Sequence, residues 1–553
     1  MPNGIEEPVQ EESDHREISV AEFFEKNKHL LGFENPQKSI ITVVKEAVDN
    51  SLDACEEDAI LPEIQVLVDE IDDKKCRIEI RDNAIGLDRE TIPKVFGKLL
   101  YGSKFHKLQQ SRGQQGIGIS ASAMYAQLTT GEPVTVYSKQ KDEPCHRFVV
   151  RIDTEKNEPE ILEDEIIEPE SDEFPGDKDY FFDHGTSIEM NIEAKYTKGH
   201  HSVRNYLKHT AIMNPYARVV LREPDGNKVE FPRVSQELPE KPKEIKPHPH
   251  GVEIGRLMKM AHTTDATTIN QFLKQDFTRV GRTTAKRILE EASLRDGIKP
   301  HSLKRGDAEK LIEAIKKTDI MSPPTDCIAP IGADLLEKGL KKEVNAEFYA
   351  STTRTPKVYR GNPFLIETAI AWGGDLEKDG AATVFRYANR VPLLYQKGAC
   401  AATEAVSQTN WKNYGLKQTG NNVPRGPVVI VVHIASVWVP FTSEAKEAIA
   451  QYEEIVKEIK LAVQEVGRSL KKHLKKKRSV KKELKKRQYI KTYIPHIAEA
   501  LTDILENDEE TKNVEKKLKN LLRQERGELE KMEFDPSENK EYDEELANIG
   551  RKD

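Results

Sequence analysis

Apolar positions along this chain recur with two periods, one suited to helices and the other to strands. Residues 39–60 carry the helical period, and Asn35-Pro36 before them supplies a cap and a first-turn proline. Short blocks rich in β-branched residues predict strands. These blocks are residues 63–70, 76–82, 133–139, 146–152 and 186–192. The mixture predicts an α+β architecture for the first 230 residues or so.

The pattern changes after residue 232. A proline-rich linker, residues 238–251, leads into a short helical module at about 252–316. Mixed strands and helices return from about 328 to 438, and a long helical pattern follows Ser443. That helix has one apolar stripe at spacings of three and four. The stripe consists of Ile455, Ile459, Val463, Val466, Leu470 and Leu474.

Composition narrows the class of protein. A chain of 553 residues is too long for one core, so we expect three or four domains. Neither a membrane-spanning apolar run nor the layout of a secretory signal is present. The five cysteines are scattered without a C-x-x-C pair, which favours a reducing cytoplasm over a zinc module or a disulfide framework. With a net charge of −9, any nucleic-acid contact must come from local basic surfaces. An acidic, proline-containing stretch at 155–180 is expected to be a solvated insertion.

The stretch "SRGQQGIGIS" at 111–120 carries three glycines in the spacing G-x-x-G-x-G. Taken alone, this pattern is also typical of an ordinary turn. The glycines run into a helix-compatible stretch, however, and glycines before a helix N-terminus let backbone amides point at phosphate oxygens. The spacing is neither that of the dinucleotide fingerprint nor that of a Walker A loop. The sequence therefore predicts a phosphate-binding loop of another type.

Two further segments carry candidate chemistry. Glu46, Asn50 and Asp53 fall at i, i+4 and i+7, so they share one face of the predicted helix. A solvated acidic face would explain them equally well. Asp82 ends a predicted strand and is followed by a turn containing Gly86, which could be turn chemistry alone.

Together and in this order, these segments resemble the GHKL ATPase superfamily. The Glu-Asn-Asp helix resembles its N box, "DNAIG" its D-x-G-x-G box with Ala84 in place of the middle glycine, "GQQGIG" its lid, and "HGTSIEM" its last box. The stretch "YGSKFHKLQQSRGQQGIGISASAMYAQLTTG" narrows the resemblance to the B subunits of type IIB DNA topoisomerases, the topoisomerase VI family of archaea. "INQFLKQDFTRVGRTTAKRILEEA" resembles the helix-two-turns-helix domain of that family. "YANRVPLLYQKGAC", "NWKNYGLKQ" and "VHIASVWVPFTSEAKEAIA" resemble its transducer domain.

The resemblance implies an α+β multidomain protein. Its parts would be a GHKL (Bergerat) ATPase α/β sandwich with an N-terminal strap, a helix-two-turns-helix insert, a transducer with a ribosomal-protein-like α/β fold, and a C-terminal stalk helix with an acidic tail that docks the A subunit. The implied boundaries are 1–230, 231–316, 317–470 and 471–553.

The resemblance also assigns roles to residues. Glu46 matches the general base that activates water, Asn50 the Mg²⁺ ligand, and Asp82 the carboxylate that accepts the adenine amino group. The other implied ATP-binding residues are Gly86, Ser103, Lys104, Gly113, Gln114, Gln115, Gly116, Ile117, Gly118, Ile119, Ser120 and Thr186. A transducer lysine should reach the γ-phosphate. Lys412 is favoured for its place after Trp411, and Lys417 is the alternative.

The implied activity is that of the ATP-hydrolysing subunit of a DNA topoisomerase. ATP and Mg²⁺ would be its cofactors, ATP would dimerise two copies, and an A subunit would cleave the DNA within an A2B2 assembly. Double-stranded DNA is the expected substrate, and the nucleoid within the cytoplasm of an archaeon is the expected location. Candidate DNA contacts are the basic segment 468–491 and, less specifically, Arg279, Arg282, Lys286 and Arg287. A protein-clamping GHKL chaperone and a mismatch-repair clamp are the rival interpretations, and both lack the helix-two-turns-helix insert.

Overall fold

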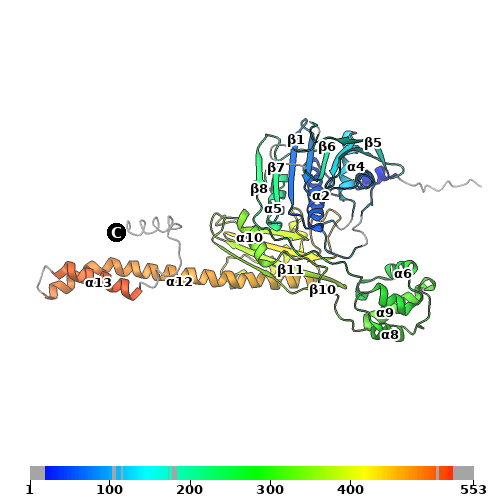
Figure 1. The fold of residues 1–553 in the computed structure, drawn as a ribbon. Coiled ribbons are helices and arrows are strands. Elements are labelled where there is room, and N and C mark those ends of the chain that lie inside the picture. The colour runs from blue at the N-terminus through cyan, green and yellow to red at the C-terminus, as the bar shows by residue number, and fades with distance from the viewer. Residues whose placement is uncertain are drawn as a thin grey trace, which may run out of the picture. The chain divides into compact units, whose positions relative to one another are not determined.

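The computed structural model describes residues 19–102, 107–113, 116–171, 174–176, 183–505 and 510–526 (Figure 1). The chain divides into two compact units, residues 1–468 and 469–553, which are described separately below. As the sequence predicts, it is an α+β protein with several domains. Among the helices described, none is long and apolar enough to cross a membrane.

The described part of residues 19–231 forms an eight-stranded sheet with helices packed against it (Figure 1). The strand order is β5-β4-β3-β6-β2-β1-β7-β8; only β1 and β7 run parallel, and every other neighbouring pair is antiparallel. The strands are β1 Glu63–Glu70, β2 Lys75–Asp82, β3 Val134–Lys139, β4 Cys145–Asp153, β5 Glu158–Ile167, β6 Gly185–Glu193, β7 Arg218–Arg222 and β8 Lys228–Phe231. The helices are α1 Val20–Asn27, α2 Pro36–Glu57, α3 Ile92–Gly97, α4 Gly118–Thr130 and α5 Val203–Met213.

Helix α2 starts where the sequence predicts. The Asn35 side chain accepts a hydrogen bond from the backbone amide of Lys38 (3.0 Å), and Pro36 occupies the first turn. A cap of this kind stabilises a helix by about 1 kcal/mol. The apolar face of α2 packs on the sheet in the main core, with Val44, Val48 and Leu52 fully buried. This packing fixes which residues of α2 face away from the sheet.

The acidic stretch predicted to be a solvated insertion instead contributes an edge strand. Residues of β5 pair with β4 throughout its length, with one register shift between Val149 and Val150. Basic partners neutralise its carboxylates: Arg89 pairs with Asp164, and Arg151 with Glu160. The composition does not indicate this strand, because its acidic residues occupy exposed positions of β5 at the edge of the sheet.

Residues 249–317 form the helical module predicted from the sequence, with a core of its own. Its elements are η1 Pro249–Gly251, α6 Ile254–Thr263, α7 Ile269–Asp276, α8 Arg282–Glu291, η2 Pro300–Ser302 and α9 Arg305–Lys317. Leu257, Phe272, Leu289 and Leu311 are among its buried residues.

A second sheet follows, with strand order β10-β11-β14-β12-β13 and β9 paired to β11. Strands β12 and β14 run parallel, and the other pairs are antiparallel. The strands are β9 Phe348–Thr353, β10 Lys357–Tyr359, β11 Asn362–Trp372, β12 Thr383–Ala388, β13 Val391–Pro392 and β14 Val428–Ser436. The helices are α10 Ala333–Glu343, η3 Lys397–Ala399, α11 Ala401–Gln408 and η4 Trp411–Tyr414.

Helix α5 belongs to both cores. Leu207 and Ala211 are buried with the first sheet, whereas Ile212 and Met213 are buried with α10, β11 and β14. The Nδ1 atom of His209 lies 2.9 Å from the Tyr387 hydroxyl of β12. The two sheets are therefore joined through one helix.

The long helix α12 spans Glu453–Leu505, and α13 spans Glu510–Arg526. In the first unit, Ile455, Ile459, Val463 and Val466 of the predicted stripe are buried. In the second unit, the Thr511 hydroxyl of α13 donates to Thr502 of α12 (2.7 Å). The acidic tail predicted after Glu528 lies outside the described residues.

The burial of His209 generates a pH prediction. Burial lowers the pKa of His209 to about 3, with Lys208 and Lys397 acting in the same direction. As the pH falls below about 6.5, the unfolded chain takes up a proton that the folded chain refuses until about pH 3. Stability is therefore lost as the pH falls, at up to about 1.4 kcal/mol per pH unit from this group.

We expect His209→Gln, which cannot titrate, to flatten this dependence between pH 4.5 and 6.5. The measurement is the thermal midpoint across that range. The exposed His29→Gln provides the matched control and should leave the slope unchanged. If the thermal midpoint of His209→Gln depends on pH as steeply as that of the parent, the assignment of this dependence to His209 is wrong.

Candidate active site

One cavity gathers most of the residues that the sequence singles out. It has a volume of about 690 Å³, within the range of small-molecule sites. Its walls come from α2, α3, the end of β2, the start of β6, the glycine-rich loop with the start of α4, two loop segments at 31–33 and 100–102, and Glu444 and Lys446 after β14. The predicted residues that line it are Glu46, Asn50, Asp82, Gly113, Gly116, Ile117, Gly118, Ile119 and Thr186.

Glu46 lies against the glycine-rich loop. A Cβ atom at Gly118 would stand 1.8 Å from Glu46 Oε2, so only glycine allows this carboxylate its position. Gly116 adopts a left-handed φ of +59°, which also favours glycine. Two of the three glycines therefore have a structural reason, and the one at 118 serves the carboxylate directly.

The start of α4 faces the same cavity. The helix begins at Gly118, and its N-cap residue Ile117 makes no side-chain cap to the first turn. Amides of a first turn that no side chain caps attract anions, and the helix dipole adds to the attraction. The loop and the helix start can therefore hold a phosphate group.

Asp82 is buried at the end of β2 and tightly held. Its carboxylate accepts hydrogen bonds from the Ser51 hydroxyl (2.7 Å) and from the backbone amides of Ala84 and Thr186 (both 3.1 Å). Burial raises the pKa of Asp82, and these hydrogen bonds act against that shift. Ala84 has no left-handed φ, so the alanine that departs from the family pattern fits its turn without strain.

Several predicted residues lie elsewhere. Gly86 and Ser120 do not line the cavity. Gly86 has a φ of +76°, and a Cβ there would stand 2.4 Å from the Lys139 carbonyl oxygen, so its role is in the turn. The Ser120 hydroxyl donates to the carbonyl of Ile117 (3.2 Å). Ser103, Lys104, Gln114 and Gln115 lie outside the described residues.

The favoured lysine, Lys412, does not lie at the cavity. It is exposed on η4, and the alternative, Lys417, is exposed after that turn. Among the described residues, the lysine that lines the cavity is Lys446, whose Nζ donates to the backbone carbonyl of Arg112 (3.3 Å). Burial lowers the pKa of Lys446, and nearby Glu46 opposes that shift.

Lys446 is not among the residues that the sequence predicts, because the apolar pattern assigns the residues after Ser443 to the long helix. The structure starts that helix at Glu453. Lys446 has a left-handed φ of +54°, a strained conformation that often marks functional positions. No periodicity in the sequence shows that strain.

Asp49 is a second unpredicted group. It is 3% exposed, and its Oδ1 accepts a hydrogen bond from the Tyr206 hydroxyl (3.2 Å). Burial raises the pKa of Asp49 to about 6, while Lys45, Arg112 and Lys446 lower it. This raised pKa belongs to a carboxyl group one position before Asn50.

Asn50 provides the neutral amide oxygen expected of a Mg²⁺ ligand. Within the described ranges, no group of three or more His, Cys, Asp or Glu residues could hold a metal ion by itself. A magnesium ion at Asn50 would therefore need oxygens from a bound phosphate and from water, which is how Mg²⁺ is usually held beside nucleotides.

Two family models match the chain. The model of the histidine kinase-, DNA gyrase B- and HSP90-like ATPase covers residues 38–186, which include the α2 and β2 residues of the cavity. The model of the topoisomerase VI B subunit transducer covers residues 323–487, which include Lys446.

Curated relatives match nearly the whole chain. The B subunit of the type 2 DNA topoisomerase 6 of Archaeoglobus fulgidus is 50% identical over 89% of this chain and 80% of its own length. The protein of the same name from Methanococcoides burtonii is 50% identical over 91% of this chain and 79% of its own length. An ATPase fold, a transducer and a cavity shared by both agree with these matches. The chain thus belongs to the B-subunit family of topoisomerase VI, the ATPase-bearing subunits of a type 2 DNA topoisomerase.

Proposed function

We propose that the cavity binds ATP with Mg²⁺ and that hydrolysis there drives strand passage. The observation that carries the proposal is that the transducer contributes Glu444 and Lys446 to a cavity whose other lining residues belong to the ATPase part of the chain. A ligand held by both parts can change how they are arranged, because its loss removes contacts on both sides.

Glu46 is the proposed general base. Its carboxylate lies beside the phosphate-binding loop and lines the cavity, so it can take a proton from a water that attacks the γ-phosphate. Asn50 would hold Mg²⁺, which neutralises charge on the β- and γ-phosphates.

Asp82 is the proposed acceptor for the adenine amino group. Its hydrogen bonds hold the carboxylate still at the buried end of β2, and an amino group is the partner that such an acceptor selects. Gly113, Gly116, Ile117 and Gly118 would bring backbone amides to the phosphates.

Lys446 replaces Lys412 as the proposed γ-phosphate contact. Burial disfavours the charge of an ammonium group in the free cavity, and a phosphate restores a counter-charge. Loss of the γ-phosphate would remove that counter-charge and release the transducer.

At the level of the whole enzyme, we infer that ATP dimerises two copies of this chain and closes a gate on one duplex. An A subunit would break the other duplex, in an A2B2 assembly. We assign the ATPase domain to residues 1–230, the helix-two-turns-helix domain to 231–316, the transducer to 317–470 and the stalk to 471–553. The separate cores of the first sheet and the helical module support the first two assignments.

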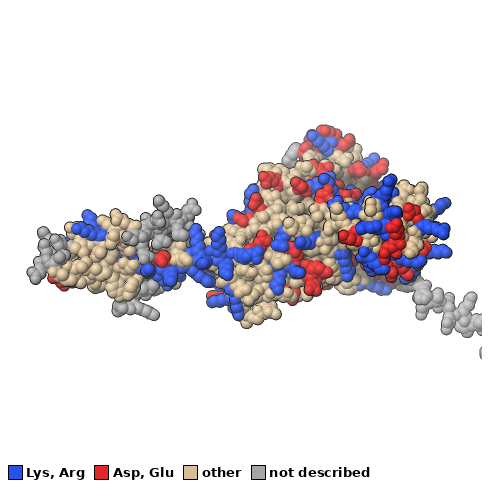
Figure 2. Space-filling model, turned by 90° about the horizontal axis from the view of Figure 1, so that it is seen from below, with Lys and Arg blue, Asp and Glu red and all other residues tan. Residues whose placement is uncertain are grey.

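DNA is the proposed partner of the basic part of α12. Figure 2 shows Lys and Arg side chains gathered along the middle of this helix, where residues 471–491 hold twelve of them. Dense charge of one sign suits a phosphate backbone. In the helical module, Arg279 and Arg287 donate to the backbone carbonyls of Ser322 and Asp319, so these two arginines also serve the fold.

The A subunit is the proposed partner of the second unit. Exposed apolar residues recur there on one face of α12, at spacings of three and four. They are Tyr489, Tyr493, Ile497, Leu501 and Ile504.

The role of Glu46 can be tested with an isosteric change. Glu46→Gln should slow ATP hydrolysis at least 100-fold, because an amide cannot accept the proton. Affinity for a non-hydrolysable ATP analogue should stay within about threefold, since the loop is untouched. Glu57→Gln, on the same helix and at the rim of the same cavity, is the matched control. Hydrolysis near the parent rate would remove Glu46 from the role of base.

The two lysines separate in a paired experiment. Lys446→Met keeps the apolar stem and the backbone preference but removes the charge. A charge-assisted contact of about 1.5–3 kcal/mol predicts at least tenfold slower turnover at saturating ATP. Lys412→Met should stay within twofold. The opposite result would return the contact to Lys412, as the sequence predicts.

Dimerisation can be followed by light scattering. A non-hydrolysable ATP analogue with Mg²⁺ should double the mass of the chain. Asp82→Asn should prevent this at the same analogue concentration, because the amide turns a donor toward the adenine amino group. An unchanged mass of the parent chain at saturating analogue would contradict the gate.

A further inference from the structure

The stem of the glycine-rich loop, residues 110–113, is held by the transducer as well as by α2. The Gln110 amide donates to the Cys327 carbonyl (2.9 Å), and the Gln110 side chain accepts from the Ala329 amide (2.8 Å). One residue on, the Ser111 carbonyl accepts from the side-chain amide of Asn389 (2.9 Å). The transducer therefore touches the chain just before the first glycine of the loop.

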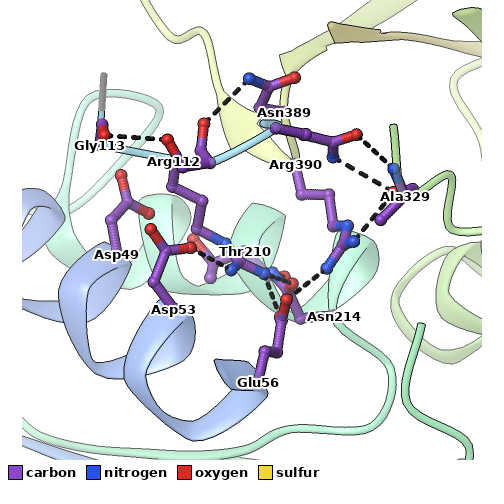
Figure 3. Close-up of polar contacts among 12 residues, drawn as sticks. Asp49, Asp53, Glu56, Arg112, Gly113, Thr210, Asn214, Ala329, Asn389 and Arg390 are labelled. Carbon is purple, nitrogen blue, oxygen red and sulfur yellow. Dashed lines mark hydrogen bonds and ion pairs between the residues drawn. The ribbon is translucent and has the colours of Figure 1, made fainter. Parts of the chain in front are cut away.

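Arg112 ties the same stem to α2. Arg112 is 4% exposed, and its guanidinium donates to Asp53 (2.7 Å), Glu56 (2.5 Å) and Asn214 (2.6 Å), as Figure 3 shows. Asp53 and Glu56 follow Glu46 and Asn50 on α2, so the loop stem is fixed to the helix that carries the proposed base.

Arg390 reaches the same carboxylate from the transducer (Figure 3). Its guanidinium donates to Glu56 Oε2 (2.8 Å), to the Tyr216 hydroxyl (2.9 Å) and to the Ala329 carbonyl (2.9 Å). Burial would raise the pKa of Glu56, but the two arginines outweigh it and hold that pKa below its ordinary value. Glu56 is thus a charged carboxylate shared by the loop stem and the transducer.

The backbone at Arg390 is strained. Asn389 and Arg390 form the two-residue turn between β12 and β13, with φ values of +47° and +68°. Such turns favour Asn-Gly, because the second position suits glycine. An arginine at this position implies that the contacts of its guanidinium outweigh the cost of the backbone strain.

We propose that Arg390 is a positioning residue for nucleotide binding. Through Glu56 and Arg112 it keeps the loop stem in place on α2, so that ATP affinity depends on how the transducer turn is seated. A stem that is already ordered lowers the conformational entropy lost when the loop engages phosphates. The Arg112 carbonyl, which accepts from Lys446, is part of the same stem. The inference rests on the proposed ATP site.

Arg390→Gly is the discriminating variant, tested in the full chain. It gives the turn the Asn-Gly pair that favours it most, so the fold is kept while the guanidinium is lost. We expect the Kd of a non-hydrolysable ATP analogue and the KM for ATP to rise about tenfold. The kcat at saturating ATP should stay within threefold, because bound nucleotide then holds the loop. Arg390→Lys can still reach Glu56 and should recover part of the affinity.

A double substitution tests the route through Glu56. Arg112→Met alone should raise the Kd of the analogue to a similar extent. The double variant Arg112→Met with Arg390→Gly should have a Kd no more than about twofold above that of the single variant that binds less tightly. Arg386→Met is the matched control, because Arg386 is buried on β12 but donates to the carbonyls of Leu393 and Tyr395. Its analogue Kd should stay within twofold of the parent value.

Parent-like affinity in Arg390→Gly would overturn the inference and leave the proposed function standing, and so would multiplicative effects in the double variant. If Arg390→Gly does not fold, parent-like affinity in Arg390→Met, which keeps the apolar stem but cannot pair with Glu56, would overturn it as well. A parent chain that binds no ATP analogue would instead overturn the proposed function itself.

Discussion

Charges that leave water must be balanced, and this constraint shapes the centre of the first unit. Arg112 and Arg390 are 4% and 3% exposed, and Asp53 and Glu56 supply two opposite charges within hydrogen-bonding distance. Buried ion pairs add little net stability compared with apolar packing, because desolvation opposes their attraction. What they provide is geometry: each guanidinium accepts only one arrangement of its partners. The relation between loop, α2 and transducer is therefore specified by orientation more than by hydrophobic contact.

Close approach of backbone and side chain is the second requirement of the site. Gly118 leaves room for the Glu46 carboxylate, and Gly185 leaves room for the Asp82 carbonyl, which would stand 1.9 Å from a Cβ. Neither carboxylate residue could keep its place beside a larger side chain. Glu46 and Asp82 therefore keep their places because Gly118 and Gly185 have no side chain.

Much of the fold could be predicted from local patterns in the sequence. The period of α2 and its Asn35 cap, and the strands around Asp82, could be predicted because they depend on neighbours in sequence. Strand β5 could not, since its acidic residues mimic a solvated loop until Arg147 and Arg151 are placed beside it. The cavity residues of α2 and β2 were predicted from a known motif, whereas Lys446 meets the loop only through tertiary structure. The same holds for Arg390 and Glu56, which lie 334 residues apart.

The double packing of α5 has a consequence for synthesis. Its residues Ile212 and Met213 are buried in a cluster whose other buried members begin at Ile331. While the ribosome makes the helical module, the first sheet can fold, yet this end of α5 stays uncovered. Domains fold as they emerge, and transiently exposed apolar surface invites aggregation. During synthesis, the folded first sheet therefore exposes apolar surface at the end of α5 until the second sheet is made. That surface is a binding site for chaperones at this stage.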